Sequence, residues 1–128
     1  MLDFDNEDIF DLVLQVCRGF AVDPMASLEA EDFFRRLLST YTGADEPAAI
    51  RSWLEERLAQ HFVALQDPPR WLQTSDWQFE EEQPMLFVGQ IDIPQQHSAV
   101  AASRFHDDTS FYIFVGREGP PRVIMQQM

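Results

Sequence analysis

The sequence predicts an α+β fold in which three N-terminal helices pack on a small, mainly antiparallel C-terminal sheet. Two observations lead to this prediction. Apolar residues recur with a period near 3.6 in residues 1–67, and the period falls towards two in residues 68–128. In addition, a length of 128 residues suits one compact domain, and no linker or repeat divides the chain. We therefore expect a single domain over residues 1–128, with a helical half and a β-rich half.

Three amphipathic helices are expected in the first half of the chain. Their apolar stripes cover residues 9–20, 28–41 and 47–65, and a proline or glycine follows soon after each stripe. Ser27 is a residue type that caps helix N-termini, and Pro47 suits the first turn of the third helix. Each helix needs an apolar surface against which to pack.

Four β-prone segments follow the proline pair that ends the helical half. They are Trp71–Gln73, Met85–Ile93, Phe111–Val115 and Arg122–Gln127. Glycines and prolines in residues 116–121 predict a hairpin between the last two segments. The second segment begins with a nearly continuous apolar run, which favours a central strand covered on part of both faces. We expect about four strands, with the helices on one face of the sheet.

One hydrophobic core is expected to join the helices to the sheet. Five residues assigned to this core are Phe34, Leu38, Leu54, Phe87 and Phe114. The lone cysteine, Cys17, falls on the apolar stripe of the first helix, so we expect its thiol to be buried and inert. A hydrolase that paired Cys17 with His61 would need an exposed thiol, which this position disfavours.

Charge is the strongest compositional signal. The chain holds 22 acids against nine bases, a net charge of −13, and none of the bases is lysine. This composition excludes a lysine Schiff base and a Walker-type phosphate lysine. A negative field repels polyanions, so nucleic acid is not an expected ligand, and a basic protein partner fits better. The candidate acidic surface opens with Asp3, Asp5, Glu7 and Asp8. Further acids that could contribute to it are Asp11, Glu29, Glu31, Asp32, Asp45, Glu46, Glu55 and Glu56.

Three features favour a cytoplasmic location. The acidic beginning of the chain is the opposite of the basic start of a secretory signal. No run approaches the ~20 apolar residues of a membrane span. A single cysteine cannot form an internal disulfide, as expected in a reducing compartment.

Two groups of polar residues could in principle form reactive sites. His97 and His106, with Asp107 and Asp108, offer metal-ligand atoms, but their spacing matches no metal motif and their surroundings predict a solvated loop. The acids Glu80–Glu82 precede a proline and are typical of a solvated turn rather than of a pair of catalytic carboxylates. No metal, cofactor or catalytic residue is therefore expected.

Large aromatics around the proline pair form a tentative binding site. Trp71 and Trp77 could fill the core, line a groove or anchor an interface. Arg70 could stack on an aromatic ring or pair with an acid. A pocket between helices and sheet would be lined by these tryptophans with Phe87 and Gln90.

The second half of the chain resembles the YwqG-like family of uncharacterised bacterial proteins. The resemblance rests on residues 69–73, on Trp77 and on residues 84–92, which read Pro-Met-Leu-Phe-Val-Gly-Gln-Ile-Asp. Later strands at 111–115 and 123–126 fit the same pattern. The resemblance implies no catalytic residue, but some family members lie in bacterial toxin and immunity neighbourhoods. Residues 1–67 have no counterpart in the pattern.

These observations lead to one functional expectation and two alternatives. The chain is expected to be a non-enzymatic, acidic protein-binding module, immunity-like or regulatory, in a bacterial cytoplasm. The first alternative is a small-molecule-binding protein or enzyme with a pocket between helices and sheet. The second is a nucleic-acid mimic that presents its carboxylates to a DNA-binding protein.

Overall fold

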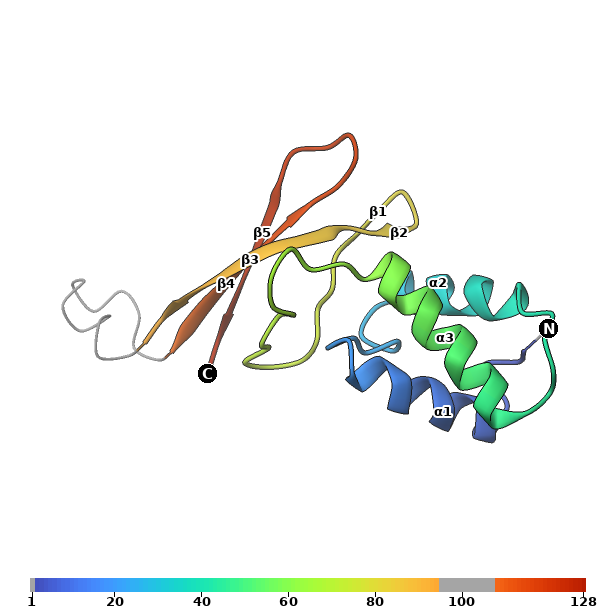
Figure 1. Ribbon diagram of the computed structural model, residues 1–128. Helices are drawn as coiled ribbons and strands as arrows, with labels where there is room; N and C mark the ends of the chain where they lie inside the picture. The colour runs from blue at the N-terminus through green and yellow to red at the C-terminus, as the bar shows by residue number, and fades with distance from the viewer. Residues whose placement is uncertain (1, 95–107) are drawn as a thin grey trace.

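A computed structural model describes residues 2–94 and 108–128 of the chain. Within these residues, three helices and two small antiparallel sheets confirm the predicted α+β layout (Figure 1). The helices are α1 (Glu7–Arg18), α2 (Leu28–Ser39) and α3 (Pro47–His61). The strands are β1 (Phe79–Glu80), β2 (Gln83–Pro84), β3 (Leu86–Ile93), β4 (Thr109–Val115) and β5 (Arg122–Gln127). No helix in the described part of the chain is long and apolar enough to span a bilayer.

Side-chain caps begin the first two helices. Asn6 Oδ1 accepts hydrogen bonds from the N–H groups of Asp8 and Ile9, at 3.0 and 3.2 Å. Ser27 Oγ accepts one from the Ala30 N–H at 3.1 Å, which confirms the predicted cap of α2. These contacts satisfy backbone donors that have no partner within the first turn of a helix.

The third helix ends earlier than the sequence pattern predicts. The prediction extended it to residue 65, but α3 stops at His61. The next residues run beside β3, where Phe87 N–H donates to the Val63 carbonyl and Leu65 N–H donates to the Phe87 carbonyl, each at 3.0 Å. Backbone pairing with a strand far along the chain therefore replaces the last helical turn.

The main sheet has the strand order β3-β4-β5, and both pairings are antiparallel. The predicted hairpin between the last two strands is confirmed. The prediction of a central strand from residues 85–91 is wrong for this three-stranded sheet, because β4 is its central strand; beyond β4, β3 is bonded only at Phe87, to residues 63–65, among the described residues. A register shift between Phe87 and Gly89 bends β3 near its start.

Residues 71–73 form a loop and not the predicted strand. Side chains of the sheet bind this loop by hydrogen bonds. These bonds substitute for the backbone hydrogen bonds that would pair a strand with its neighbour. Gln126 Oε1 accepts from the N–H groups of Leu72 and Gln73 at 3.0 and 3.1 Å, and Gln126 Nε2 donates to the Thr74 carbonyl at 2.8 Å. The Tyr112 hydroxyl accepts a second bond from Leu72 N–H, at 3.2 Å.

A two-residue turn joins β1 to β2. Glu81 and Glu82 both have positive φ values, 49° and 68°, as in a type I′ hairpin turn. The turn was predicted to be solvated, and Glu81 and Glu82 are exposed, but Glu80 is half-buried. Its Oε1 accepts from the N–H groups of Glu118 and Gly119 at 3.2 and 3.1 Å, and so attaches this hairpin to the β4–β5 loop.

One core connects the helices with the inner face of the sheet. All five residues assigned to it are at most 2% exposed, which confirms that prediction: Phe34, Leu38, Leu54, Phe87 and Phe114. Aromatic rings form much of the contact between the layers. The Phe62 ring lies 5.3 Å from Trp77, and Trp77 lies 5.7 Å from Phe114.

Cys17 is fully buried in α1, as predicted. Burial, and then the negative charge of Asp23, raise the pKa of the Cys17 thiol, so the reactive thiolate is scarce at neutral pH. We expect a thiol reagent to label native protein slowly and denatured protein completely. Rapid stoichiometric labelling of the folded chain at neutral pH would show that the thiol is accessible.

Candidate functional site

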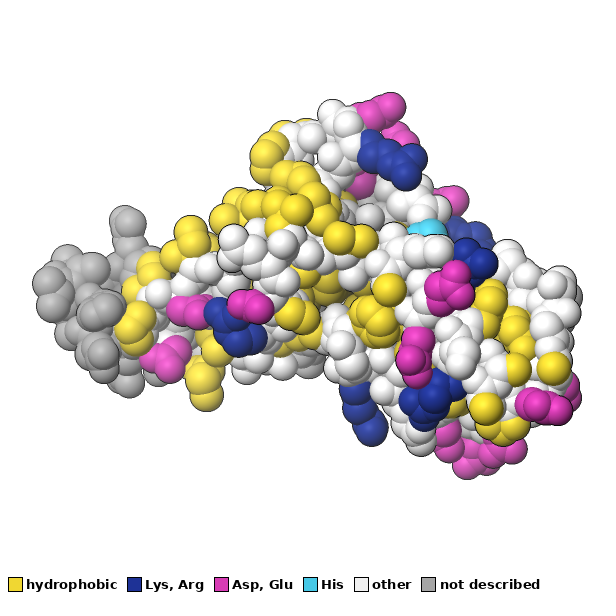
Figure 2. All heavy atoms as spheres, viewed as in Figure 1, with side chains coloured by type: hydrophobic (Ala, Val, Ile, Leu, Met, Phe, Trp, Pro, Cys, Tyr) yellow, Lys and Arg dark blue, Asp and Glu magenta, His cyan; other side chains and the backbone are white. Residues whose placement is uncertain are grey.

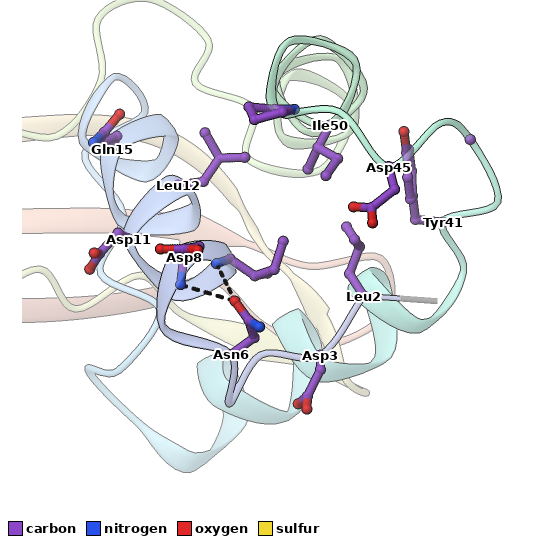
Figure 3. Close-up of a pocket in the computed structure, with 13 residues that line it drawn as sticks. Leu2, Asp3, Asn6, Asp8, Asp11, Leu12, Gln15, Tyr41, Asp45 and Ile50 are labelled. Atoms are coloured by element: carbon purple, nitrogen blue, oxygen red, sulfur yellow. Dashed lines mark hydrogen bonds between the residues drawn. The ribbon is translucent and has the colours of Figure 1, made fainter.

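A groove of about 740 Å³ opens between α1, the loop after α2 and the start of α3 (Figure 3). Its lining combines carboxylates, uncharged polar groups and aliphatic side chains. The lining residues are Leu2, Asp3, Asn6, Asp8, Ile9, Asp11, Leu12, Gln15, Tyr41, Gly43, Asp45, Pro47 and Ile50. Side chains from three separate segments thus converge on one concave surface of the helical half.

Uncompensated negative charge distinguishes this groove. Among the residues that the structure describes, four aspartates and no Arg or Lys line it. No ion pair engages these four carboxylates within the part of the chain that the structure describes. Figure 3 shows Asp45 reaching towards Leu2 and Ile50, whereas Asp3 and Asp11 point away from the space between the elements. The groove therefore offers carboxylates at its wall and rim beside apolar surface.

The first turn of α1 positions the acids on one side of the groove. The Asn6 cap fixes the helix start, and Asp8 and Asp11 are three residues apart, so both lie on the same side of the helix. Both side chains belong to exposed residues. The N-terminal end of the helix dipole further favours a carboxylate at Asp8.

A compact loop positions the acid on the opposite side. The Tyr41 hydroxyl donates to the Ala44 carbonyl at 2.5 Å, and the Tyr41 ring packs 5.0 Å from Trp53. A Cβ atom at Gly43 would lie 2.6 Å from the Tyr41 hydroxyl, so this close approach requires glycine. Tyr41 and Gly43 thereby shape the turn that carries Asp45.

The acidic residues predicted to form the candidate surface do not all lie together in the structure. Asp3 and Asp8 line the groove. Asp5 instead pairs with Arg35, with 3.0 Å between Oδ1 and Nη2, and Arg35 also pairs with Glu31. Glu7 is exposed in α1 but is not part of the groove lining. The sequence predicted Asp11 and Asp45 only as further acidic residues that could contribute to the candidate surface. No sequence signal shows that these two side chains converge on one groove.

The tryptophans assigned to the tentative binding site are engaged in packing. Trp77 is 5% exposed, and its Nε1 donates to the Met85 carbonyl at 3.0 Å. Half-buried Trp71 lies 4.6 Å from the Tyr112 ring, and its Nε1 donates to the Ala21 carbonyl at 2.8 Å. Phe87 is 2% exposed and belongs to the core.

Arg70 and Gln90 belong to a polar network beside β3. Arg70 pairs with Asp92 at 3.1 Å, and Gln90 Oε1 accepts from the Arg70 N–H at 2.8 Å. The Ser110 hydroxyl donates to Asp92 at 2.6 Å. This bond, with the bonds from Gln90 and Arg70, lowers the pKa of the Asp92 carboxyl despite partial desolvation. The network ties residue 70 to the sheet.

A small hollow adjoins this network. It has about 130 Å³, and its lining includes Arg70, Phe87 and Gln90 but neither tryptophan. Ligand pockets usually reach ~300 Å³ or more, so the hollow is small for a metabolite. Among the described residues, no group of three or more His, Cys, Asp or Glu side chains could hold a metal ion. His97, His106 and Asp107 lie outside the described residues.

Comparisons with known proteins return no relative of this chain. No family model matches it, and searches of curated proteins and of solved structures give no match. The YwqG-like resemblance of the second half therefore stays a prediction.

Proposed function

We propose that this chain is a non-enzymatic protein-binding module that receives a basic segment of a partner protein in the groove beside α1. The observation that supports the proposal is the set of four aspartates in that groove, which have no ion-pair partner among the described residues. We further propose an immunity-like or regulatory role in a bacterial cytoplasm, which follows from the acidic composition and from the resemblance of the second half.

The chemistry of the groove suits lysine or arginine side chains. Half-buried Leu2 and Leu12 offer aliphatic surface for the methylene stem of such a side chain. Aspartates at the rim can then accept hydrogen bonds from its charged head. A net charge of −13 adds a long-range field that raises the association rate of a cationic partner.

A basic peptide tests the proposal. We expect a short Lys-rich peptide to bind the wild-type chain in a calorimeter, and the affinity to fall as salt rises from ~0.05 to ~0.5 M. The triple variant Asp8→Asn, Asp11→Asn, Asp45→Asn should lose at least ~10-fold in affinity, or ~1.4 kcal/mol.

A matched variant separates the groove from the overall charge. Glu29→Gln, Asp32→Asn and Glu56→Gln remove the same three charges from exposed positions outside the groove lining. We expect this variant to retain binding within ~3-fold, because distant exposed charges are screened. Equal losses in the two triple variants would contradict a specific site in the groove.

A further inference from the structure

A second groove, between α3 and the end of α2, adjoins the groove beside α1. It has about 740 Å³, and the two grooves share Tyr41 and Gly43 in their linings. Its chemistry is the opposite of that of the first groove. Trp53, Arg57 and His61 line it, and among the described residues no Asp or Glu does, although the chain holds 22 acids.

One side of α3 supplies the nitrogen groups of the second groove. Trp53, Arg57 and His61 follow one another at four-residue spacing, so they lie along the same side of the helix. All three residues are half-buried. The turn after α2, which carries Tyr41 and Gly43, separates this side of α3 from the first groove.

Arg57 has no carboxylate partner. Arg51 and Arg57 are the half-buried arginines of the described chain, and Arg51 pairs with Glu55 at 3.8 Å. No ion pair engages Arg57 within the described residues. Gln60 Oε1 accepts one N–H at 2.9 Å, and a guanidinium has five N–H donors. Figure 2 shows acidic and basic side chains interspersed over the helical half, on the right of the view, so acids are not scarce there.

Two further donors of the second groove lack acceptors. The indole N–H groups of Trp71 and Trp77 donate to backbone carbonyls, whereas that of Trp53 has no acceptor among the described residues. No buried side-chain nitrogen in the described chain lacks a hydrogen bond, so solvent reaches Trp53 Nε1. Burial, and then the charge of Arg57, lower the pKa of His61, so at neutral pH its ring is uncharged and carries one N–H donor.

Capping of α2 does not account for these donors. Cationic side chains are often found where they bond to the last carbonyls of a helix. Here the carbonyls of Arg36, Leu37 and Leu38 accept hydrogen bonds at 2.6 to 3.3 Å from groups in residues 39–41. The end of α2 is thus capped locally, and Arg57 remains available to a ligand.

We propose that the second groove binds the carboxylate side chain of an Asp or Glu in the same partner segment whose basic residues occupy the groove beside α1. This proposal rests on the protein-binding function proposed above. A carboxylate offers only acceptors and is therefore complementary to a groove with free N–H donors and no acid. The shared Tyr41 and Gly43 bring both grooves within reach of one extended segment. The partner segment therefore carries an acid a few residues from its lysines or arginines.

Paired peptides in a calorimeter test the proposal. Each peptide has blocked ends, a short Lys run, about two to four alanines and then Glu or Gln, so that the last side chain lies ~10 to 16 Å from the Lys run in an extended chain. A second set has the reverse order. We expect the wild-type chain to bind at least one Glu peptide ~5-fold or more tighter than its Gln counterpart. Net charge alone predicts the opposite, because Glu lowers the positive charge that a chain of −13 attracts.

Two Arg variants locate the preference for Glu. Arg57→Gln should abolish it and should bind the Gln peptides within ~2-fold of wild type, because the groove beside α1 is unchanged. Arg18→Gln makes the same change at an exposed position outside both linings and should keep the preference. Trp53→Phe removes an N–H donor but keeps an aromatic ring, and it should reduce the preference.

The outcomes separate this proposal from the function on which it rests. Gln peptides that fail to bind the wild-type chain overturn both. Gln peptides that bind, without a gain for any Glu peptide, overturn the second groove alone. A preference for Glu that persists in a folded Arg57→Gln variant also overturns it. If circular dichroism shows that this variant is unfolded, an unchanged preference in Trp53→Phe has the same meaning.

Discussion

Replacing Phe87 with alanine is expected to destabilise the folded chain by about 3 to 5 kcal/mol, which is a large part of the stability of a typical domain. Phe87 is 2% exposed, and its ring lies 5.2 Å from Phe114 and 6.1 Å from Trp77. Its backbone also bonds to residues 63 and 65, so few neighbours can move to fill the cavity. Urea unfolding followed by tryptophan fluorescence measures the loss.

Ile91→Ala is the matched control for this prediction. Ile91 lies in the same strand but is 54% exposed, so its truncation removes fewer buried contacts. We expect a cost below ~1 kcal/mol at low protein concentration. A Phe87→Ala variant that unfolds at the same urea concentration as this control would mean that Phe87 is not part of the core.

Replacing Gln126 with alanine is expected to cost about 2 kcal/mol and to release the loop at residues 71–74. Gln126 is 6% exposed and makes three hydrogen bonds to the backbone of that loop. Leu72 N–H keeps the Tyr112 hydroxyl as a partner, and water reaches exposed Gln73 and Thr74, so the loss is smaller than for a fully buried network. Urea unfolding measures the cost, and hydrogen exchange of the Gln73 amide reports release of the loop.

Gln83→Ala provides the same chemical change on an exposed strand residue, and we expect it to be neutral within ~0.5 kcal/mol. Gln126→Glu tests the polar contacts separately from side-chain volume. A glutamate keeps the acceptor for the two N–H groups but loses the donor to Thr74, so its amide exchange should lie between wild type and Gln126→Ala. Unchanged exchange in the alanine variant would show that the loop does not depend on Gln126.

Local sequence signals were sufficient for the helices and for the fold class. The period of the apolar residues identified all three helices, and the Ser27 cap and the Pro47 start were correct because capping depends on residues within one turn. Alternation and turn residues likewise identified β4, β5 and the hairpin between them. Burial of the five predicted core residues follows from the same periodicity.

Long-range contacts decide where α3 ends, and the local apolar pattern therefore predicted the wrong C-terminal end for this helix. The apolar pattern continues to residue 65, but pairing of Val63 and Leu65 with Phe87 ends the helix at His61. The β-prone residues 71–73 form a loop because side chains from Gln126 and Tyr112 satisfy the Leu72 and Gln73 N–H groups. Both outcomes depend on partners more than twenty residues away.

The sequence by itself determined the charge, the fold class and the residues of the core, because these depend on composition and on periods within one element. Only the tertiary structure decided which acids share a groove and which strand lies at an edge. Asp8 and Asp45 line opposite sides of one groove because α1 packs beside α3, whereas Asp5 is paired with Arg35. The apolar run of residues 85–91 predicted a strand covered on at least part of both faces, but Ile91 is 54% exposed. Periodicity shows that a helix or strand has an apolar or a charged side, but only packing shows what lies opposite that side.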